Sequence, residues 1–224
     1  MHSADEEKLV AFYQCDITSR PAVQQAAEAI RSDYGPPSIL INNAGIGNAN
    51  TILESTPERL RAIFDVNLIS HWYTVQEFLP DMIAKKKGHI MSTASMAAFV
   101  GLAGMADYSC TKAGLIAFYE ALTQELKHRY NAPQVQTSIV YPLWVRTKLT
   151  EGLAANLKKA GAPVMEASYV AEAMVRQIMA ARSGQLVLGP AGAPSVRALP
   201  IWIQELLRDH QAQIVTMNAT TAVA

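Results

Sequence analysis

The chain has 224 residues, of which half are hydrophobic and 17% are charged. A chain of this length and composition can bury a sizeable core as one soluble domain. Its 19 basic and 19 acidic residues balance, and no stripe of Lys and Arg interleaved with aromatic residues occurs, which argues against a nucleic-acid partner. Two cysteines, Cys15 and Cys110, are too few for a disulfide framework, and we expect no metal site.

The N-terminal residues lack the basic and apolar segments of a signal peptide. No uninterrupted apolar run of ~18 residues, the length that spans a membrane, occurs either. We therefore expect a cytoplasmic protein and leave peripheral contact with a membrane surface open.

The first part of the chain alternates between strand and helix patterns. An apolar run at Leu9–Tyr13 predicts a strand, after which Thr18 or Ser19 caps a helix that Pro21 enters. The continuous apolar run Ser38–Ile41 predicts a parallel strand that is covered on both faces.

Small and amide residues follow this strand in the order Asn42, Asn43, Ala44, Gly45. Open α/β sheets bind ligands at the ends of their strands, so these residues predict a ligand-side loop. A plain turn is the alternative, since Asn and Gly are also what turns prefer.

A second helix is predicted to start at Ser55 or Thr56, just before Pro57, and its apolar positions recur at helical spacing. Asn67 is the polar member of that stripe. A buried amide must find hydrogen bonds or lose stability. Asn67 is therefore either a satisfied structural residue or part of a site.

The stretch Met91–Lys112 sets a hydroxyl, a phenol and an ammonium within one predicted strand, loop and helix. Tyr108 and Lys112 stand four positions apart and so share a helix face. A phenol has a pKa near ~10 and serves as a general base near neutrality only beside a positive charge that stabilises its phenolate. An ordinary helix face is the alternative, and Ser95 and Asn67 favour the proton-transfer site.

The second part of the chain continues the alternation. Strands are predicted at Val135–Tyr141 and Gln185–Leu188, a weak helix at Glu151–Lys159, and a stronger helix at Tyr169–Arg182 capped by Ser168. This alternation predicts an α/β fold with a parallel sheet and helices on both faces.

An amphipathic helix is predicted at Leu199–Leu207. It could pack on the body, cover a substrate pocket or touch a membrane surface, and we favour packing. No period is visible from Gln211 onward, so we expect one domain over 1–210 and a mobile tail over 211–224.

The spacing of the polar residues resembles that of the short-chain dehydrogenase/reductase family. Tyr108 follows Ser95 by 13 positions and Asn67 by 41, and Lys112 follows Tyr108 by 4. Together with the Asn-Asn-Ala-Gly run, these motifs cover the chain to about Leu188. The run Phe78-Leu79-Pro80-Asp81-Met82 and the strand entry Gly88-His89-Ile90 resemble the branch of retinol and 17β-hydroxysteroid dehydrogenases.

The resemblance implies roles for four catalytic residues. Tyr108 would be the acid/base, and Lys112 would bind the nicotinamide ribose and depress the tyrosine pKa. Ser95 would bond the substrate oxygen, and Asn67 would hold a proton-relay water. This fits general acid–base chemistry in which a hydride passes to or from the cofactor.

The same resemblance implies NADP or NAD as cofactor, with NADP preferred. Asp16 would contact the adenine end. Asn43, Ala44 and Gly45 would line the adenosine ribose, and Val145 and Thr147 would meet the nicotinamide carboxamide. Tyr108 and Lys112 complete the set of expected cofactor-binding residues.

Two departures from the family pattern stand out. The glycine-rich turn of the family and its first two strands are absent from these 224 residues, so we expect a Rossmann-like, doubly wound sheet that lacks them. In the family's strand order, this would leave the Leu9–Tyr13 strand unpaired and the strand ending at Asn42 exposed. The second departure is Leu143, where the family usually has Gly.

Our first hypothesis is an NAD(P)-dependent oxidoreductase that interconverts a hydroxyl and a carbonyl on an apolar small molecule, as a homodimer or homotetramer. The alternative is a truncated, non-catalytic family member that acts as an interaction or dimerisation module. Five apolar residues are candidates for the substrate site and equally consistent with core packing: Met96, Phe99, Leu143, Trp144 and Leu149.

Overall fold

The computed structural model describes residues 10–47, 49–190 and 192–216. Four parallel strands form the main sheet in the order β1-β2-β3-β6. They are β1 (Ile39–Asn42), β2 (Gly88–Thr93), β3 (Val135–Pro142) and β6 (Gly184–Leu188). The described part of the chain is thus an α/β fold with a parallel sheet, as predicted.

Seven α-helices connect or flank the strands of the described chain. They are α1 (Arg20–Tyr34), α2 (Pro57–Phe64), α3 (Ser70–Lys85), α4 (Ala106–His128), α5 (Ala154–Lys159), α6 (Ala167–Met179) and α7 (Ile201–Thr216). A π-helical segment, η2 (Asp65–Ile69), joins α2 to α3, and short 3-10 segments lie at η3 (Met96–Ala98), η4 (Lys148–Leu153) and η5 (Ala193–Ala198).

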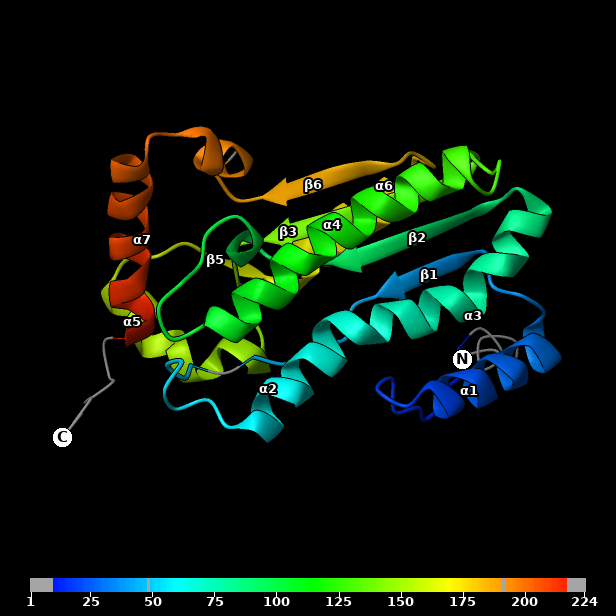
Figure 1. Ribbon diagram of the computed structural model, residues 1–224, viewed down its shortest axis with the longest axis horizontal. Helices are drawn as coiled ribbons and strands as arrows, with labels where there is room; N and C mark the ends of the chain where they lie inside the picture. Colours follow the sequence, from blue (N-terminus) through cyan, green and yellow to red (C-terminus); the bar gives the residue numbers. More distant parts are fainter. Residues whose placement is uncertain (1–9, 48, 191, 217–224) are drawn as a thin grey trace, which may run out of the picture.

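Helices cover both faces of the sheet. Figure 1 shows α3 and α4 in front of the strands and α6 behind them. Successive strand residues alternate between these layers, since Ile90 packs with α3 and α4 while Met91 packs with Val170 and Met174 of α6. The strand arrows all point toward the end of the sheet where α5 and α7 lie (Figure 1).

Strand β1 is the edge of the described sheet, and only one of its faces is covered. Ile41 is in register with Met91 and therefore faces the α6 side, where Ile39 and Ile41 remain 46% and 45% exposed. The expectation of a strand covered on both faces was therefore wrong. The expectation that the strand ending at Asn42 is exposed is confirmed.

The strand predicted at Leu9–Tyr13 is not formed by residues 10–13, and Leu9 lies outside the described residues. Val10 and Phe12 are 83% and 88% exposed, so neither a neighbouring strand nor a core holds this run extended. An apolar pattern alone does not make a strand, because its backbone groups need a partner.

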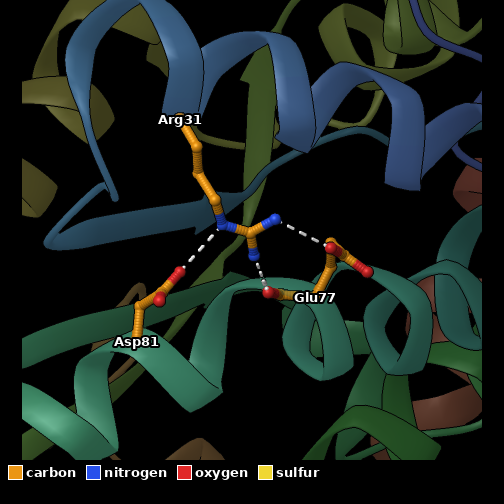
Figure 2. Close-up of polar contacts among 3 residues, drawn as sticks. All are labelled: Arg31, Glu77 and Asp81. Carbon is orange, nitrogen blue, oxygen red and sulfur yellow. Dashed lines mark hydrogen bonds and ion pairs between the residues drawn. The ribbon is translucent and has the colours of Figure 1, made fainter.

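Helix α1 is attached to α3 by a charged cluster that Figure 2 shows in close-up. Arg31 Nε lies 2.9 Å from Asp81 Oδ2, and Arg31 Nη1 lies 2.9 Å from Glu77 Oε1 (Figure 2). Arg31 Nη2 also donates to the Glu77 carbonyl, and the guanidinium lies 5.7 Å from the centre of the Phe78 ring. The planar guanidinium of Arg31 thereby bonds three acceptors on α3. The compact ammonium of a lysine could not reach all three in this geometry.

Several predicted helix ends are confirmed. Ser19 caps α1, where its hydroxyl accepts from Ala22 N, and Thr56 caps α2, where its hydroxyl accepts from Arg59 N. The predicted cap at Ser168 was wrong, because α6 starts at Ala167, two residues before the predicted start at Tyr169, with Glu166 at the cap position.

The C-terminal helix is longer than the sequence pattern predicted. Helix α7 continues to Thr216, because Ile214 and Val215 are buried against the body of the protein. The helix passes residue 210, where we expected the domain to end and a mobile tail to begin, and residues 211–216 are helical. Residues 217–224 lie outside the described part of the chain.

Candidate active site

Two neighbouring elements bring the predicted proton-transfer groups together. Helix α4 carries Tyr108 and Lys112, and the end of β2 carries Thr93 and, two residues on, Ser95. Lys112 Nζ donates to the Thr93 carbonyl at 2.8 Å and lies 5.6 Å from the centre of the Tyr108 ring. The ammonium is therefore held beside the phenol by a backbone group of the strand.

Tyr108 and Ser95 also interact. Burial raises the pKa of Tyr108, while hydrogen bonding with Ser95 acts in the opposite direction. The lowering of this pKa that the resemblance implied is therefore not the dominant effect in this structure. Ser95 Oγ accepts from Ala97 N at 3.2 Å, so its hydroxyl hydrogen can be donated either to the phenol oxygen or to the oxygen of a bound molecule.

Lys112 is 3% exposed, and burial lowers its pKa to about 8. Desolvation disfavours the charged form of a lysine. The proton on Lys112 is consequently held less tightly than on a surface lysine, although the group is still largely charged at neutrality.

Asn67 sits at the centre of the π-helical segment, where Ser70 N donates to Asp65 O five positions earlier. Its side chain bonds both backbone groups of Ile46, at 2.8 Å each, and Nδ2 also donates to Thr111 Oγ1 at 3.3 Å. The amide is thus a buried structural clamp on the loop after β1. The role of Asn67 in holding a relay water stays a prediction.

The loop after β1 is open to solvent, in agreement with a ligand-side position. Residues 43–47 are exposed, and Asn43 Oδ1 accepts from Thr93 Oγ1 at 3.0 Å. A Cβ added at Gly45 would lie 3.4 Å from Asn67 Oδ1 and 3.7 Å from Lys112 Nζ. The loop backbone at Gly45 therefore passes close to both Asn67 and Lys112.

A shallow hollow of about 410 Å³ opens beside this loop. Its lining residues are Ile46, Gly47, Asn50, Arg59, Ala62 and Ile63. A Cβ added at Gly47 would come within 3.6 Å of the Tyr108 ring, so the hollow borders the phenol.

The other predicted cofactor residues lie in two separate places. Val145 belongs to the short strand β4 (Trp144–Arg146), which pairs with β5 (Val164–Glu166), and Thr147 caps η4. Thr150 Oγ1 accepts from Thr147 N at 3.3 Å and donates to the Val145 carbonyl. Asp16 is exposed in the turn before α1, where its Oδ1 accepts from Thr18 Oγ1 at 2.7 Å and from Thr18 N at 2.9 Å, and these bonds lower the pKa of the carboxyl group. The contacts of Asp16 are thus local.

Sequence reasoning missed two polar contacts behind the site. Thr111 links Asn67 to the Tyr108 carbonyl, to which its hydroxyl donates at 2.7 Å. His71, 1% exposed on α3, lies with Nδ1 3.3 Å from Ser92 Oγ on β2. Both are polar residues inside apolar helix stripes, and this is the same signal that had singled out Asn67.

The five candidate substrate-site residues separate into two environments. Trp144 is buried in one cluster with Tyr108, and Leu143 packs against that cluster. Phe99 and Met96 belong to a different cluster, in which Phe99 lies 4.6 Å from the Tyr141 ring. Leu149 is 46% exposed.

The fold is a parallel α/β fold, in which helix α4 places a tyrosine and a lysine beside the end of strand β2. A family model described as short chain dehydrogenase matches residues 2–158. The chain therefore belongs to the short-chain dehydrogenase family, as the sequence resemblance implied.

Individual relatives agree with this assignment. The chain is 48% identical over 129 residues to the dehydrogenase RED3 of Cochliobolus heterostrophus, covering 58% of this chain and 66% of the relative. It is 33% identical over 170 residues to human epidermal retinol dehydrogenase 2, covering 76% of this chain and 54% of the relative. The matches thus span between about half and two thirds of the length of these curated relatives.

Two solved structures resemble the fold. One is a metagenomic short-chain oxidoreductase in complex with NADP, at 30% identity and a TM-score of 0.54, covering 58% of this chain and 57% of that one. The other is a short-chain type dehydrogenase/reductase from Mycobacterium marinum, at 22% identity and a TM-score of 0.72, covering 85% and 79%. Among the helices of the described residues, none combines the length and the hydrophobicity needed to span a membrane.

Proposed function

We propose that the protein is an NAD(P)-dependent oxidoreductase that interconverts a hydroxyl and a carbonyl on an apolar small molecule. The observation that carries this proposal is the Lys112 ammonium, held at 2.8 Å by the Thr93 carbonyl and 5.6 Å from the Tyr108 ring, with Ser95 near enough to the phenol to lower its pKa. Membership of the family supports catalysis over the alternative of a non-catalytic interaction module.

The proposed chemistry divides between the protein and a nicotinamide. A bound nicotinamide supplies the hydride acceptor for oxidation and the hydride donor for reduction. In the oxidation direction, the hydroxyl proton of the substrate passes to the phenolate oxygen of Tyr108, while Ser95 donates to the same substrate oxygen. The positive charge of Lys112 favours the phenolate, which is the form that accepts the proton.

The residues present fit the two ends of such a cofactor. The buried ammonium of Lys112 beside the open loop at Asn43, Ala44 and Gly45 suits the hydroxyl groups of a ribose, which need donors and acceptors. Val145 and Thr147 would meet the carboxamide, and Asp16 the adenine. We propose NADP before NAD, in keeping with the structural relative that was solved in complex with NADP.

The substrate is proposed to be apolar because the buried groups around the phenol are apolar. Trp144 and Leu157 share the Tyr108 cluster, and Leu143 packs against it.

A homodimer or homotetramer remains our proposal for the assembly, and light scattering of the purified protein tests it.

The experiment that tests the function compares wild type with Tyr108→Phe, in a form that also contains a glycine-rich cofactor turn. Retinoid, steroid and small aromatic alcohols are offered with NADP and with NAD. We expect turnover by wild type and a loss of roughly 10²–10⁴-fold in Tyr108→Phe, the usual contribution of general acid–base catalysis. Dinucleotide affinity should change little. Wild-type turnover by Tyr108→Phe, or turnover of charged polar substrates alone, would overturn the proposal.

A further inference from the structure

The hollow beside the loop after β1 has a cation at its edge. Among the described residues that line it, Arg59 on α2 is the one charged residue, and the others are apolar or neutral. Arg59 is exposed, and within the described chain no carboxylate forms an ion pair with it. A guanidinium at the edge of an apolar hollow, with no carboxylate of its own chain beside it, is available to an acidic ligand.

The neutral amide of Asn50 holds this guanidinium. In the orientation of the amide that satisfies both of its ends, Asn50 Oδ1 accepts from Arg59 Nη1 at 2.7 Å, and Asn50 Nδ2 donates to the Ala49 carbonyl at 3.2 Å. A guanidinium has five N–H donors in a planar fork, so this bond leaves donors for a ligand. Asn50 therefore orients the guanidinium of Arg59 without neutralising its charge.

The residue that holds Arg59 is itself tied to the helix that carries the phenol. The backbone of Asn50 forms an isolated parallel bridge with Met105, which lies at the cap position of α4, three residues before Tyr108. Met105 and Tyr108 also share one buried apolar cluster. A short series of contacts thus links the position of the guanidinium to that of the phenol.

The apolar surface of the hollow lies between the two groups. Ile63 follows Arg59 by four positions, so the two share a face of α2, and both line the hollow. Ile63 is buried in the cluster that contains Tyr108. A Cβ added at Gly47 would lie 3.1 Å from Leu149 Cδ1 and 3.6 Å from Tyr108 Cδ2. A ligand in the hollow therefore meets the guanidinium at one side and the neighbourhood of the phenol at another.

We propose that the substrate carries a carboxylate on its apolar body, away from the reacting carbon, and that Arg59 binds this carboxylate. The fork of a guanidinium matches the two oxygens of a carboxylate, so the contact selects acids and fixes which end of the molecule faces the phenol. Arg59 is then a specificity-determining residue. This inference rests on the proposed function, which it deepens by assigning one acidic group to the apolar substrate.

The test measures binding of a matched pair of ligands without turnover. The aromatic keto acid 4-benzoylbutyrate and its uncharged methyl ester are titrated calorimetrically into the purified 224-residue chain, Arg59→Met and Arg61→Met. Arg61 is the matched control, because it is exposed on the same helix but is not among the lining residues of the hollow. Arg59→Met should weaken binding of the acid by roughly 5-fold or more, the upper end for an exposed ion pair, and leave binding of the ester unchanged. Arg61→Met should bind both ligands as wild type does.

Thermal unfolding of each variant shows whether it is folded. If Arg59→Met unfolds, Arg59→Lys, which keeps the charge but loses the fork, should show a smaller loss of affinity for the acid. Added salt should weaken binding of the acid by wild type more than binding of the ester. Equal losses in the Arg59 and Arg61 variants, equal losses for acid and ester, or no binding of the acid by wild type would overturn the proposal.

A phosphate of the dinucleotide is the other anion that Arg59 could bind. Titration of NADP into a form that also contains a glycine-rich cofactor turn separates the two cases. Loss of NADP affinity in Arg59→Met, with affinity for the acid unchanged, would assign Arg59 to the cofactor and refute the proposal. Binding of the acid that depends on Arg59, in a protein whose Tyr108→Phe variant keeps full turnover, would instead refute the proposed function and leave the carboxylate site in place.

Discussion

Lys112 Nζ is bonded to the carbonyl oxygen of Thr93 at 2.8 Å, so a side chain that starts on α4 is held by the end of β2. An ammonium has three N–H donors, and this carbonyl engages one of them. The proposed function assigns the remaining donors to a ribose hydroxyl. In a form that also contains a glycine-rich cofactor turn, Lys112→Ala should therefore weaken both dinucleotide binding and turnover, in contrast to Tyr108→Phe. Steady-state kinetics with equilibrium titration separates the two patterns.

The lowered pKa of Lys112 predicts a pH dependence of stability. The unfolded chain takes up this proton below about pH 10.5, whereas the folded protein does so only below about pH 8. Between these values the unfolded state binds more protons, so the free energy of unfolding rises with pH, by roughly 3 kcal/mol over the window. Urea unfolding of wild type should show this rise, and Lys112→Met should lack it.

The control for that measurement is Lys127→Met, at an exposed position of the same helix. It should leave the slope of stability against pH unchanged. Parallel curves for wild type and Lys112→Met would contradict the assigned shift.

His71 predicts a second pH effect, on the acid side. Burial, with a smaller contribution from the charge of Lys112, lowers the pKa of His71 to about 3. The unfolded chain protonates this histidine below about pH 6.5 while the folded protein does not, so stability falls as pH falls from about 6.5 to 3. The loss from this group should reach roughly 3–5 kcal/mol, and His71→Phe should flatten the acid limb of the stability curve in urea titrations. An acid limb as steep in His71→Phe as in wild type would refute this.

Asn67→Ala should destabilise the protein by roughly 2–4 kcal/mol, because it leaves both backbone groups of Ile46 without their partner inside the fold. The exchange rate of the Ile46 amide hydrogen should rise in parallel. The exposed Asn43, which accepts one bond from Thr93, is the matched control, and Asn43→Ala should cost much less. Equal losses for the two variants would show that the clamp is energetically unimportant.

A polypeptide of these 224 residues alone should bind neither NADP nor NAD with useful affinity. Dinucleotide binding in such folds relies on backbone N–H groups and a helix N-terminus at the pyrophosphate, and no glycine-rich turn of that kind occurs in the sequence. The remaining contacts would hold only the two ends. Calorimetric titration of the folded protein tests this, and micromolar binding of either dinucleotide would show that another element takes over the role of the turn.

The sequence predicted best those parts of the fold whose signal is local. The predicted start of α4 at Ala106 and its end near His128 are confirmed, because a long helical period and a following Asn-Ala-Pro break mark them within a few residues. The helix face shared by Tyr108 and Lys112 follows from the same period. The contact of Lys112 with Thr93 could not be predicted, since it depends on how α4 packs against β2.

The π-helical segment explains why Asn67 stood out in the sequence. One extra residue in the turn between α2 and α3 shifts the helix face by about 100°, the angle between successive residues at 3.6 per turn. The apolar stripe therefore includes one position that points toward the loop at Ile46 rather than into the core. A constant helical period identified Asn67 as a polar residue within an apolar stripe, but it could not predict which groups the amide would bond.

Predictions failed where an element depends on distant partners. The run at 10–13 has strand-like residues but no strand beside it, and residues 211–216 lack a visible period yet become helical because Ile214 and Val215 are buried. Both outcomes were decided by tertiary contacts, which overrule local pattern.

The Arg31 cluster has a consequence for how the protein opens. Helix α1 is joined to the body by side-chain packing and by the bonds of Arg31 to Glu77 and Asp81, whereas the segment before it adds no strand to the sheet. We expect α1 to exchange and unfold at a lower free energy than the core strands. Asp16 lies in the turn before α1, while Tyr108 and Lys112 lie on α4. Mild denaturant should therefore release α1 and the turn that contains Asp16 before it unfolds α4 and the strands of the sheet.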